Sequence, residues 1–378
     1  MPAHQTTQFT VPEDLIDLGI GQPSLSLLPA AALQEAAAHR LGLGDRHVLQ
    51  YGAAQGDGFF RRTLARFLAQ HHGVPTEMDQ LLITAGASQA LDLICTRLAR
   101  PGDTIFVEEP TYFLALLIFR DHQLNVVGIP MDDKGLIIEA LEESLRKHRP
   151  VFLYTIPAFH NPSTVTLNAQ RRERLVELSR EHGFTIVADE VYQMLNYTTV
   201  PPRPLAAHID TGNVLSLGSF SKILAPGLRL GWIQAAPARL DALIHAGLLE
   251  SGGGLNPFTS GIVRSAIELG LQEKCLAHLK TVYAARAAAL TGAVRRYLPE
   301  PIEVAEPAGG LFLWMRLRGQ RDAQELLAVA RRHQVSFQPG SKFSSAGGLR
   351  DCLRLSFAYY ETEQLIEGVA RLGRALGS

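Results

Sequence analysis

Apolar segments of strand length recur through the middle of the chain, and stretches with helical periodicity lie among them. The segments VFLYTI at 151–156, FTIVADE at 184–190, VLSLGSF at 214–220 and LRLGWIQA at 228–235 are almost continuously apolar. A strand that is apolar on both sides is buried on both faces of its sheet, so helices must cover the two faces. The alternation therefore predicts an α/β fold built on a mostly parallel sheet.

Helical periodicity and helix-end signals predict the elements around this sheet. Ser88 is a candidate N-cap for its helix, and Gly73 and Gly183 should end theirs, because glycine accepts the left-handed conformation found at many helix ends. The long helix at 271–297 should lead into a smaller α+β part made of FLWMRL, a helix, VSFQP, CLRLSF and a final helix. The main predicted helices lie at 58–70, 88–100, 168–182, 271–297 and near 321–333.

Composition and charge narrow the class of partner. The chain has 378 residues, of which 46% are hydrophobic and 19% are charged, and its formal net charge is −1. Without an excess of basic residues it offers little to the phosphates of a nucleic acid, so a small-molecule partner is expected. The apolar run from Phe113 to Phe119 is too short to cross a membrane, and the N-terminus lacks the pattern of a secretory signal.

Cysteine and histidine patterns suggest neither disulfides nor metal. The three cysteines are widely spaced, which fits neither a disulfide framework nor a zinc site. The thirteen histidines contain no HExxH pattern. We therefore expect a cytoplasmic protein without a bound metal.

Polar residues stand at or after the ends of the predicted strands. Asn161 comes a short loop after 151–156, Asp189 closes the strand at 184–190, and Lys222 follows the strand at 214–220. Ligands of open α/β sheets bind beyond the carboxyl ends of the strands. Taken singly, each residue would equally suit a helix cap, a turn or a surface charge.

The segment GSFSKILAPGLRLGW strengthens the prediction of a site. It surrounds Lys222 with Ser219, Ser221 and, seven residues further on, Arg229. A lysine that forms a Schiff base must lose its proton, and a desolvated or cationic neighbourhood favours that loss. The arginine and the two hydroxyl groups would serve a phosphate nearby.

A second place for a phosphate is the segment AGASQA. There Gly86, Ala87, Ser88 and Gln89 open a helix, whose free N–H groups and dipole favour an anion. A small-residue turn at a helix start accounts for the same pattern equally well.

Two other motifs fit the chain poorly. The spacing of Ser219 and Lys222 matches the SxxK pattern of penicillin-binding proteins and serine β-lactamases, but the Lys-Thr-Gly element that those proteins need is missing. Gly52, Gly56 and Gly58 do not make a dinucleotide-binding fingerprint, because no strand precedes them.

Taken together, the motifs resemble those of a known family. GSFSK…GLRLGW, ADEVY, the Asn161-Pro162 step, ITAGASQALDL and EEPTY occur in the order and spacing found in class I/II aminotransferases, the fold-type I enzymes that use pyridoxal 5′-phosphate (PLP). The resemblance covers about residues 15 to 375. IDLGIGQPSLSLLP and GGGLNPFTS look most like the 2-aminoadipate and kynurenine branch, which also supplies the C-terminal domain of MocR-like regulators.

The resemblance implies the fold of this family: a large domain with a mostly parallel central sheet, and a smaller α+β domain. We expect residues 1–50 to form an N-terminal arm and part of the small domain. Residues 51–285 should form the large PLP-binding domain, and residues 286–378 the small C-terminal domain.

The resemblance also implies roles in binding the cofactor. Lys222 would form the Schiff base and carry protons, and Asp189 would keep the pyridine nitrogen protonated. Asn161 and Tyr192 would bond to the phenolic oxygen of the ring, and Tyr112 would stack on the ring. The phosphate would be held by Ser88, Gln89, Ser219, Ser221 and Arg229, and Tyr51 would reach the phosphate of the other subunit.

Arg354, in LRLSF, would hold the α-carboxylate of the substrate, together with Asn161 and with the backbone of Gly21 nearby. Three of the residues in these roles would also suit a purely structural place. Tyr112 could belong to the core, Arg354 to a structural ion pair, and Tyr51 to a turn before a helix.

The chain departs from the family pattern at three places. The usual loop reads Asn-Pro-Thr-Gly, and here Thr164 stands in place of the glycine. His160 replaces a commoner glutamine before Asn161, and it either faces the active site or is incidental. Asp57 and Gly58 replace an apolar pair, which could change how a partner subunit packs near the cofactor.

We therefore expect a homodimeric aminotransferase with shared active sites that moves the amino group of an L-amino acid to a 2-oxo acid. Another PLP-dependent reaction (β-elimination, decarboxylation or O₂-dependent oxidation) is an alternative, because the cofactor residues are nearly the same in such enzymes. A PLP-binding sensor without turnover is a further one.

Overall fold

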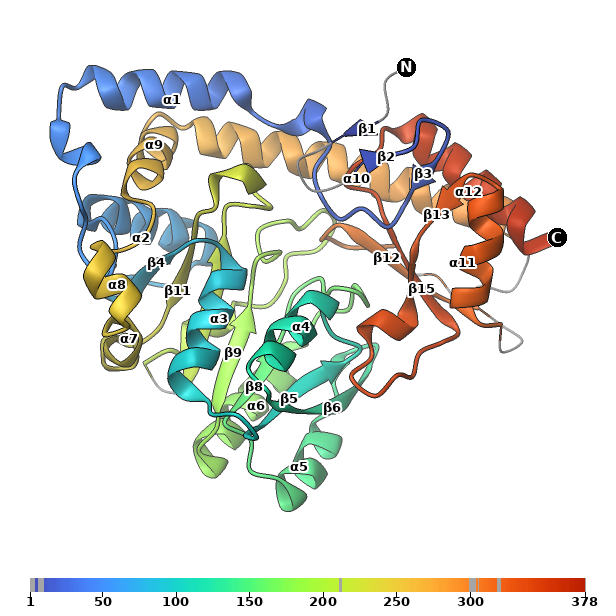
Figure 1. Ribbon diagram of the computed structural model, residues 1–378, viewed down its shortest axis with the longest axis horizontal. Coiled ribbons are helices and arrows are strands. Elements are labelled where there is room, and N and C mark those ends of the chain that lie inside the picture. The colour runs from blue at the N-terminus through green and yellow to red at the C-terminus, as the bar shows by residue number, and fades with distance from the viewer. Residues whose placement is uncertain are drawn as a thin grey trace.

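The computed structural model describes residues 4–5, 10–210, 213–298, 304, 306–317 and 321–377. A large sheet with its helices and a smaller sheet lie side by side in it (Figure 1). The long helix α10 (Leu271–Tyr297) runs along the top of both. The predicted combination of a large α/β part and a smaller α+β part is confirmed.

Within the described ranges, the large sheet contains eight strands. In spatial order they are β4 (Leu81–Thr84), β11 (Gly231–Gln234), β10 (Val214–Ser219), β9 (Thr185–Asp189), β8 (Phe152–Thr155), β5 (Thr104–Glu109), β6 (Asn125–Asp132) and β7 (Gly135–Leu136). The pairs from β10 to β6 are parallel, whereas β11 is antiparallel to both neighbours and β7 to β6. The sheet is therefore mostly parallel, as predicted.

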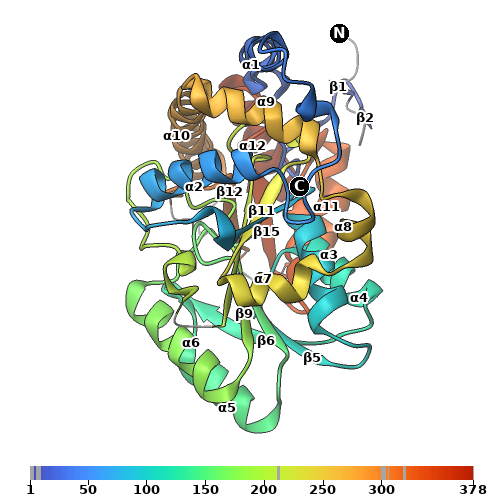
Figure 2. The ribbon, with the colours of Figure 1, turned by 90° about the vertical axis from the view of Figure 1, so that its left-hand side faces the viewer.

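Successive residues of the inner strands enter two separate hydrophobic cores. On β5, Phe106 belongs to one core and Val107 to the other, and Leu153 and Tyr154 of β8 divide in the same way. This is the two-residue alternation of a strand whose two faces are both covered. Figure 2 shows the covering helices on opposite sides of the sheet: α3 (Ala87–Leu98) and α4 (Phe113–Asp121) on one, α5 (Ile138–Lys147) and α6 (Ala169–His182) on the other.

The remaining helices before α10 gather near the β4 edge of the sheet (Figure 1). They are α1 (Ala30–Gly42), α2 (Gly58–His72), α7 (Pro237–Ile244), α8 (Gly247–Gly252) and α9 (Pro257–Glu268). Among the described residues, no helix has both the length and the apolar character needed to span a membrane.

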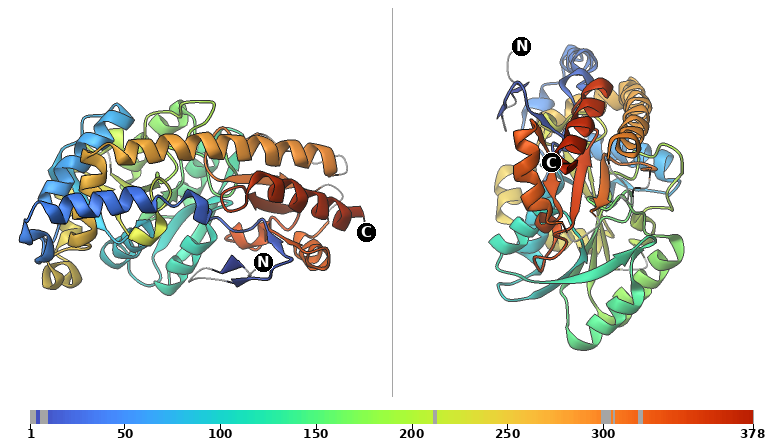
Figure 3. Two further views of the ribbon diagram at one scale, coloured as in Figure 1. Left: turned by 90° about the horizontal axis from the view of Figure 1, so that it is seen from above. Right: turned by 90° about the vertical axis from the view of Figure 1, so that its right-hand side faces the viewer.

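The smaller part joins the two ends of the chain. Strand β13 (Val335–Ser336) pairs in parallel with β3 (Ile16–Asp17), which ties the N-terminal segment to the C-terminal part. A short antiparallel pair, β1 (His4–Gln5) and β2 (Thr10–Val11), precedes β3. The other elements are an antiparallel sheet of β12 (Phe312–Arg316), β15 (Cys352–Ser356) and β14 (Gln338–Pro339), with helices α11 (Ala323–Arg332) and α12 (Thr362–Gly377). Helix α12 packs along α10 (Figure 3).

Several predicted boundaries differ from the structure. The strand predicted at 228–235 begins only at Gly231, because Arg229 takes a left-handed conformation (φ 47°) after the short helix η5 (Pro226–Leu228). Ser88 does not cap α3. The helix begins one residue earlier, Gly86 (φ 91°) makes the turn into it, and no side chain caps it.

Two further differences concern segments that sequence patterns described only in part. The predicted strand VSFQP is divided, because β13 pairs with β3 whereas β14 pairs with β15. The apolar run from Phe113 to Phe119 forms most of α4, which buries Ala115 and Phe119. The predicted helix ends at Gly73 and Gly183 are confirmed, with φ values of 62° and 77°.

Candidate active site

The predicted site residues meet where the large sheet faces the smaller part. Asp189 is the last residue of β9, and Asn161 and Lys222 follow β8 and β10. Arg354 comes from β15 of the small sheet, and Gly21 comes from the segment that follows β3. The carboxyl ends of parallel strands bring Asp189, Asn161 and Lys222 together, as expected for an open α/β sheet. The smaller part of the molecule adds Arg354 and Gly21 from the opposite side.

Lys222 has a lowered proton affinity. Its side chain is partly buried, and Nζ donates a hydrogen bond to the carbonyl oxygen of Gly21 at 3.3 Å. Desolvation and the positive charge of Arg354 lower the pKa of Lys222 to about 8, against the opposing effect of Asp189. About a tenth of such a lysine is therefore an uncharged nucleophile at pH 7.

Asp189 is buried with one oxygen unsatisfied. Its Oδ2 accepts a hydrogen bond from the hydroxyl of Tyr154 at 2.7 Å, whereas Oδ1 is buried without a hydrogen-bond partner. Burial raises the pKa of Asp189 to about 6, although the Tyr154 hydrogen bond, the backbone N–H of Val191 and the charge of Lys222 pull it down. A buried acceptor without a donor is costly, so this carboxylate is suited to a ligand that brings its own N–H group.

Ser219, Ser221 and Arg229 gather near the start of α3. Ser219 Oγ lies 3.0 Å from Ser221 Oγ, and Arg229 donates to Ser221 Oγ at 3.4 Å and to the carbonyl oxygen of Ala85 at 2.9 Å. A side chain at Gly86 would meet the guanidinium, since a Cβ there would lie 2.7 Å from Arg229 Nη2. Hydroxyls, a guanidinium and a helix N-terminus at one place suit a phosphate.

Ser88 and Gln89, the other two predicted phosphate ligands, occupy the first turn of α3. Ser88 is exposed in the single chain, and the side chain of Gln89 accepts a hydrogen bond from the backbone N–H of Ala85 at 3.2 Å. Tyr51 is 82% exposed in the single chain.

Arg354 is a buried cation held by neutral groups. It donates to Asn161 Oδ1 at 2.7 Å and to the carbonyl oxygen of Gly19 at 3.0 Å, and its Nε has no partner. Its guanidinium carbon lies 4.0 Å from the ring centre of Phe312 and 4.9 Å from that of Phe343. Burial lowers the pKa of Arg354 to about 10. Within the described residues it forms no ion pair, so the structural ion pair that the sequence left open is not found.

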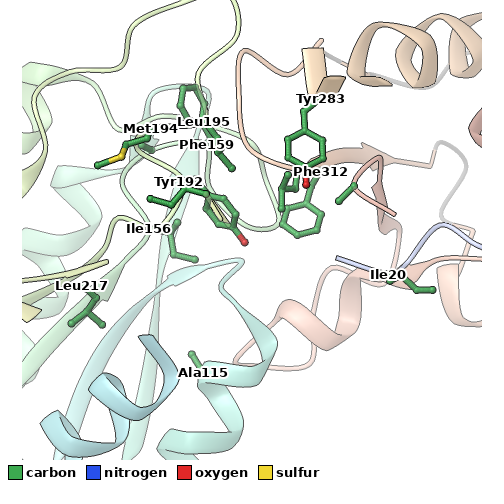
Figure 4. Packing of buried hydrophobic residues seen from close by; sticks show 14 of the residues in the cluster. Ile20, Ala115, Ile156, Phe159, Tyr192, Met194, Leu195, Leu217, Tyr283 and Phe312 are labelled. Atoms are coloured by element: carbon green, nitrogen blue, oxygen red, sulfur yellow. The ribbon is translucent and has the colours of Figure 1, made fainter. Parts of the chain in front are cut away.

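Two tyrosines line the same space. Tyr192 is buried, lies close to the side chain of Asn161, and faces Phe312 edge-on at a centroid distance of 6.1 Å. Figure 4 shows its hydroxyl directed into the space between the two parts. Tyr112 precedes α4, and burial together with the charge of Asp189 raises its pKa to about 12.

Sequence patterns missed three contributors. Tyr154 pairs with Val187, two residues before Asp189, so it lies on the same face of the sheet as that carboxylate. Strand alternation could have revealed it once the pairing of β8 with β9 was known. Phe312 and Phe343 carry no local signal, because only the folding of the small sheet brings them against Arg354.

The departures from the family pattern are accommodated locally. Asp57 is the N-cap of α2, and its side chain accepts a hydrogen bond from the backbone N–H of Phe60. Thr164 has a φ of 65°, so it keeps the left-handed backbone that glycine would adopt without strain.

Comparison with known proteins agrees with this geometry. Residues 13–372 match the family described as Aminotransferase class I and II. The chain belongs to the class I and II aminotransferases. Members of this family use PLP, so the protein is a PLP-dependent aminotransferase.

Named relatives fall in the branch that the sequence suggested. The chain is 34% identical to aromatic-amino-acid aminotransferase 1 of Thermococcus litoralis, over 96% of this chain and 88% of that one. It is 35% identical to the 2-aminoadipate transaminase of Thermus thermophilus, over 94% and 88%. The Pyrococcus horikoshii kynurenine aminotransferase, solved with PMP, superposes with a TM-score of 0.91 at 32% identity, covering 97% of this chain and 91% of that one.

A regulator is also among the relatives, as the MocR-like resemblance implied. An uncharacterized HTH-type transcriptional regulator of Bacillus subtilis is 28% identical over 95% of this chain and 73% of its own length.

The burial of Asp189 predicts how the folding stability of the cofactor-free aminotransferase depends on pH. Its pKa is about 6 in the folded chain and near 4 in the unfolded chain, so the unfolded state ionises first as the pH rises. Folding stability is therefore lost between about pH 4 and pH 6, by up to about 3 kcal/mol. Asp189→Asn should be more stable than the wild type in urea unfolding at pH 7, and the two should converge near pH 4.

Asp133→Asn, at a surface aspartate, is the matched control and should follow the wild type at both pH values. Equal stability of wild type and Asp189→Asn at pH 7 would show that burial of this carboxylate costs nothing.

The left-handed backbone of Thr164 leads to a second prediction, which concerns the free energy of unfolding. A left-handed backbone costs a β-branched residue about 1–2 kcal/mol, so Thr164→Gly should raise the free energy of unfolding by about 1 kcal/mol after the greater chain entropy of glycine is counted. Thr199→Gly, at an exposed loop threonine without positive φ, should lower it by about 0.5–1 kcal/mol. Urea unfolding of the two variants decides the matter, and a stability loss in both would contradict the strain at Thr164.

Proposed function

We propose that the enzyme moves the amino group of an L-amino acid to a 2-oxo acid in two half-reactions, with Lys222 as the residue that forms the Schiff base and transfers protons. The observation that carries this proposal is the setting of Lys222, whose pKa of about 8 results from desolvation and the nearby Arg354 guanidinium. An amine with this pKa can attack a carbonyl carbon and can later hold or release a proton near neutral pH.

We propose Asp189 as the partner of the pyridine nitrogen. Its unsatisfied Oδ1 lacks the donor that a protonated ring nitrogen would supply, and Tyr154 already occupies Oδ2. When bound, PLP supplies an electron-accepting ring that stabilises negative charge at the α-carbon of an amino acid. A carboxylate at Asp189 would keep that ring cationic.

The phosphate would lie at the start of α3. Ser221 contacts both Ser219 and Arg229, and Arg229 bonds to Ala85 just before the helix, whose N-terminus offers free N–H groups. Ser88 and the neighbouring Gln89, in the first turn of the helix, would complete the set. Tyr51, which is exposed in the single chain, would reach the phosphate of the partner subunit.

On the substrate side, Arg354 would receive the α-carboxylate. It is buried, it forms no ion pair within the described ranges, and Asn161 holds one of its terminal nitrogens. A two-oxygen anion would supply the counter-charge that this guanidinium lacks. Tyr192 and Asn161 would bond to the phenolic oxygen of the cofactor, and Tyr112 would stack on its ring.

We propose aromatic and aliphatic amino acids as the preferred substrates. Phe312 and Phe343 pack against Arg354, and Phe113 lies 6.0 Å from it, so the surroundings of the carboxylate site are apolar. Relatives act on aromatic amino acids, 2-aminoadipate or kynurenine according to their names, which supports a substrate with a long side chain.

The proposed domain limits are 1–50 for the arm and part of the small domain, 51–285 for the large domain and 286–378 for the small one. Pairing of β3 with β13 supports the assignment of the N-terminal segment to the small domain. Helix α10 crosses the second limit, because it runs from 271 to 297 without a break.

We also propose a cytoplasmic homodimer with shared active sites. Large apolar side chains are exposed on neighbouring segments near the β4 edge, as a subunit interface would require. Their exposed fractions are 82% for Tyr51, 68% for Leu49 and Leu248, and 60% for Phe59.

Mixing the PLP-loaded enzyme with single amino acids separates this proposal from its alternatives. Accumulation of the amino form of the cofactor together with a 2-oxo acid, without an added acceptor, supports transamination. Release of ammonia or CO₂ would favour another PLP reaction, and the absence of any conversion across a panel of amino acids would favour a sensor.

Replacement of Lys222 tests its role directly. Lys222→Ala should retain weak PLP binding, lose the covalent label that hydride reduction leaves on the wild type, and lose about 10³-fold or more in kcat, because proton transfer loses its carrier. Absorbance, peptide mass and turnover measure this, with Lys147→Ala, at an exposed lysine near the end of α5, as the control that should match the wild type. Full turnover in Lys222→Ala would remove the mechanism.

Arg354 tests the substrate side. Arg354→Lys should raise KM for a preferred amino acid about 10- to 100-fold, because a lysine cannot hold a carboxylate with two parallel hydrogen bonds. Arg316→Lys, at an exposed arginine on the adjacent strand β12, should leave KM unchanged. A normal KM in Arg354→Lys would place the carboxylate elsewhere.

A further inference from the structure

His160 and Glu108 form a buried pair behind the loop that carries Asn161. Both side chains are excluded from solvent, and His160 Nε2 lies 3.1 Å from Glu108 Oε2, within ion-pair distance although not aligned as a hydrogen bond. Glu108 is itself fixed, because it accepts hydrogen bonds from the hydroxyl of Thr155 at 2.8 Å and from the backbone N–H of Ile156 at 2.7 Å. The carboxylate is thus anchored on the end of β8.

The other side of the imidazole holds the loop. His160 Nδ1 accepts from the backbone N–H of Ser163 at 3.2 Å, and the Ser163 hydroxyl lies 2.8 Å from the same nitrogen. An Nδ1 that accepts leaves the ring proton on Nε2, which faces Glu108. The backbone of His160 also donates to Val165 at 2.9 Å and accepts from Thr164 at 2.7 Å. One residue therefore connects the loop at 160–165 to the sheet.

Asn161 is the next residue, and its amide depends on this loop. Its Oδ1 accepts from Arg354 at 2.7 Å, and its side chain also lies close to that of Tyr192. We infer that His160 is a positioning residue: through Ser163 and Glu108 it sets the side chain of Asn161 against Arg354 and the cofactor. The part of this inference that concerns the cofactor rests on the proposed function of Asn161.

The commoner glutamine at this position could make the same two contacts, with Glu108 and Ser163, through different atoms. Its amide N–H₂ can face Glu108, and its carbonyl oxygen can accept from Ser163. Alanine can do neither, and it would leave Glu108 beside an empty space. His160→Gln should therefore preserve the geometry, whereas His160→Ala should release the loop.

The decisive measurement is the pH midpoint of the visible absorption band of the PLP-loaded enzyme. An amide that donates to the phenolic oxygen of the cofactor lowers this midpoint, because it competes for the oxygen that helps to hold the titrating proton. His160→Ala should raise the midpoint by about half a pH unit or more, the effect of one weakened hydrogen bond. It should also lower kcat/KM about tenfold, since misplaced groups cost rate. His160→Gln should restore both.

Two further variants distinguish an effect on the position of Asn161 from a general loss of folding stability. Ser163→Ala removes only the hydroxyl at 2.8 Å and should shift the midpoint in the same direction by less. Leu178→Ala, in the hydrophobic core around α5 and α6, should lower stability without moving the midpoint. A midpoint that moves with stability in Leu178→Ala would show that loosened packing alone causes the shift, which overturns the inference.

The remaining outcomes separate the positioning role of His160 from the proposed function. Wild-type values in His160→Ala, or equal losses in His160→Ala and His160→Gln, overturn the positioning role while the proposed function stands. A wild-type enzyme that shows no visible absorption band after loading with PLP would remove the proposed function itself.

Discussion

The hydrogen bond between Arg354 and Asn161 joins the two parts of the molecule at the place where substrate must bind. Arg354 belongs to the small sheet, and Asn161 follows the large sheet, so their 2.7 Å contact spans the junction. Both residues are buried, and a buried charged donor that lost its acceptor would cost more than the bond contributes. This contact therefore links the relative position of the two sheets to the geometry of the site.

Near this contact lie three buried or partly buried groups whose charge or missing hydrogen bond lowers the stability of the folded protein. Asp189 is buried with an unsatisfied oxygen, Lys222 has a lowered pKa, and Arg354 has no acidic partner among the described residues. Each group costs free energy in the cofactor-free chain, and the two hydrophobic cores on the faces of the sheet offset that cost. A ligand with a cationic ring nitrogen and a carboxylate would satisfy Asp189 and Arg354, so the same features that weaken the free chain create affinity for cofactor and substrate.

Sequence patterns predicted the site residues that a single segment identifies. They missed the residues whose place depends on the contact between two segments. Lys222, Ser219 and Arg229 share one motif, and the strand ends that carry Asp189 and Asn161 follow from apolar periodicity. Tyr154 depends on strand pairing, and Phe312 depends on the packing of the small sheet, neither of which a local pattern contains. The strand predicted at 228–235 began too early for a related reason: a side chain far along the sequence, Asn256, bonds to the carbonyl of Arg229 in its left-handed turn.

The loop after β8 shows how a geometry can persist while its residues change. Thr164 keeps a left-handed backbone that disfavours a β-branched side chain, and such strain survives only where the surroundings over-determine the conformation. Here those surroundings are the contacts of His160 with Glu108, Ser163 and the loop backbone, all within a few ångströms. The side chain of Asn161 projects from the same loop, so the network that tolerates the strain at Thr164 also holds Asn161. What the site requires of this segment is a fixed backbone path, and a histidine–carboxylate anchor meets that requirement without the glycine.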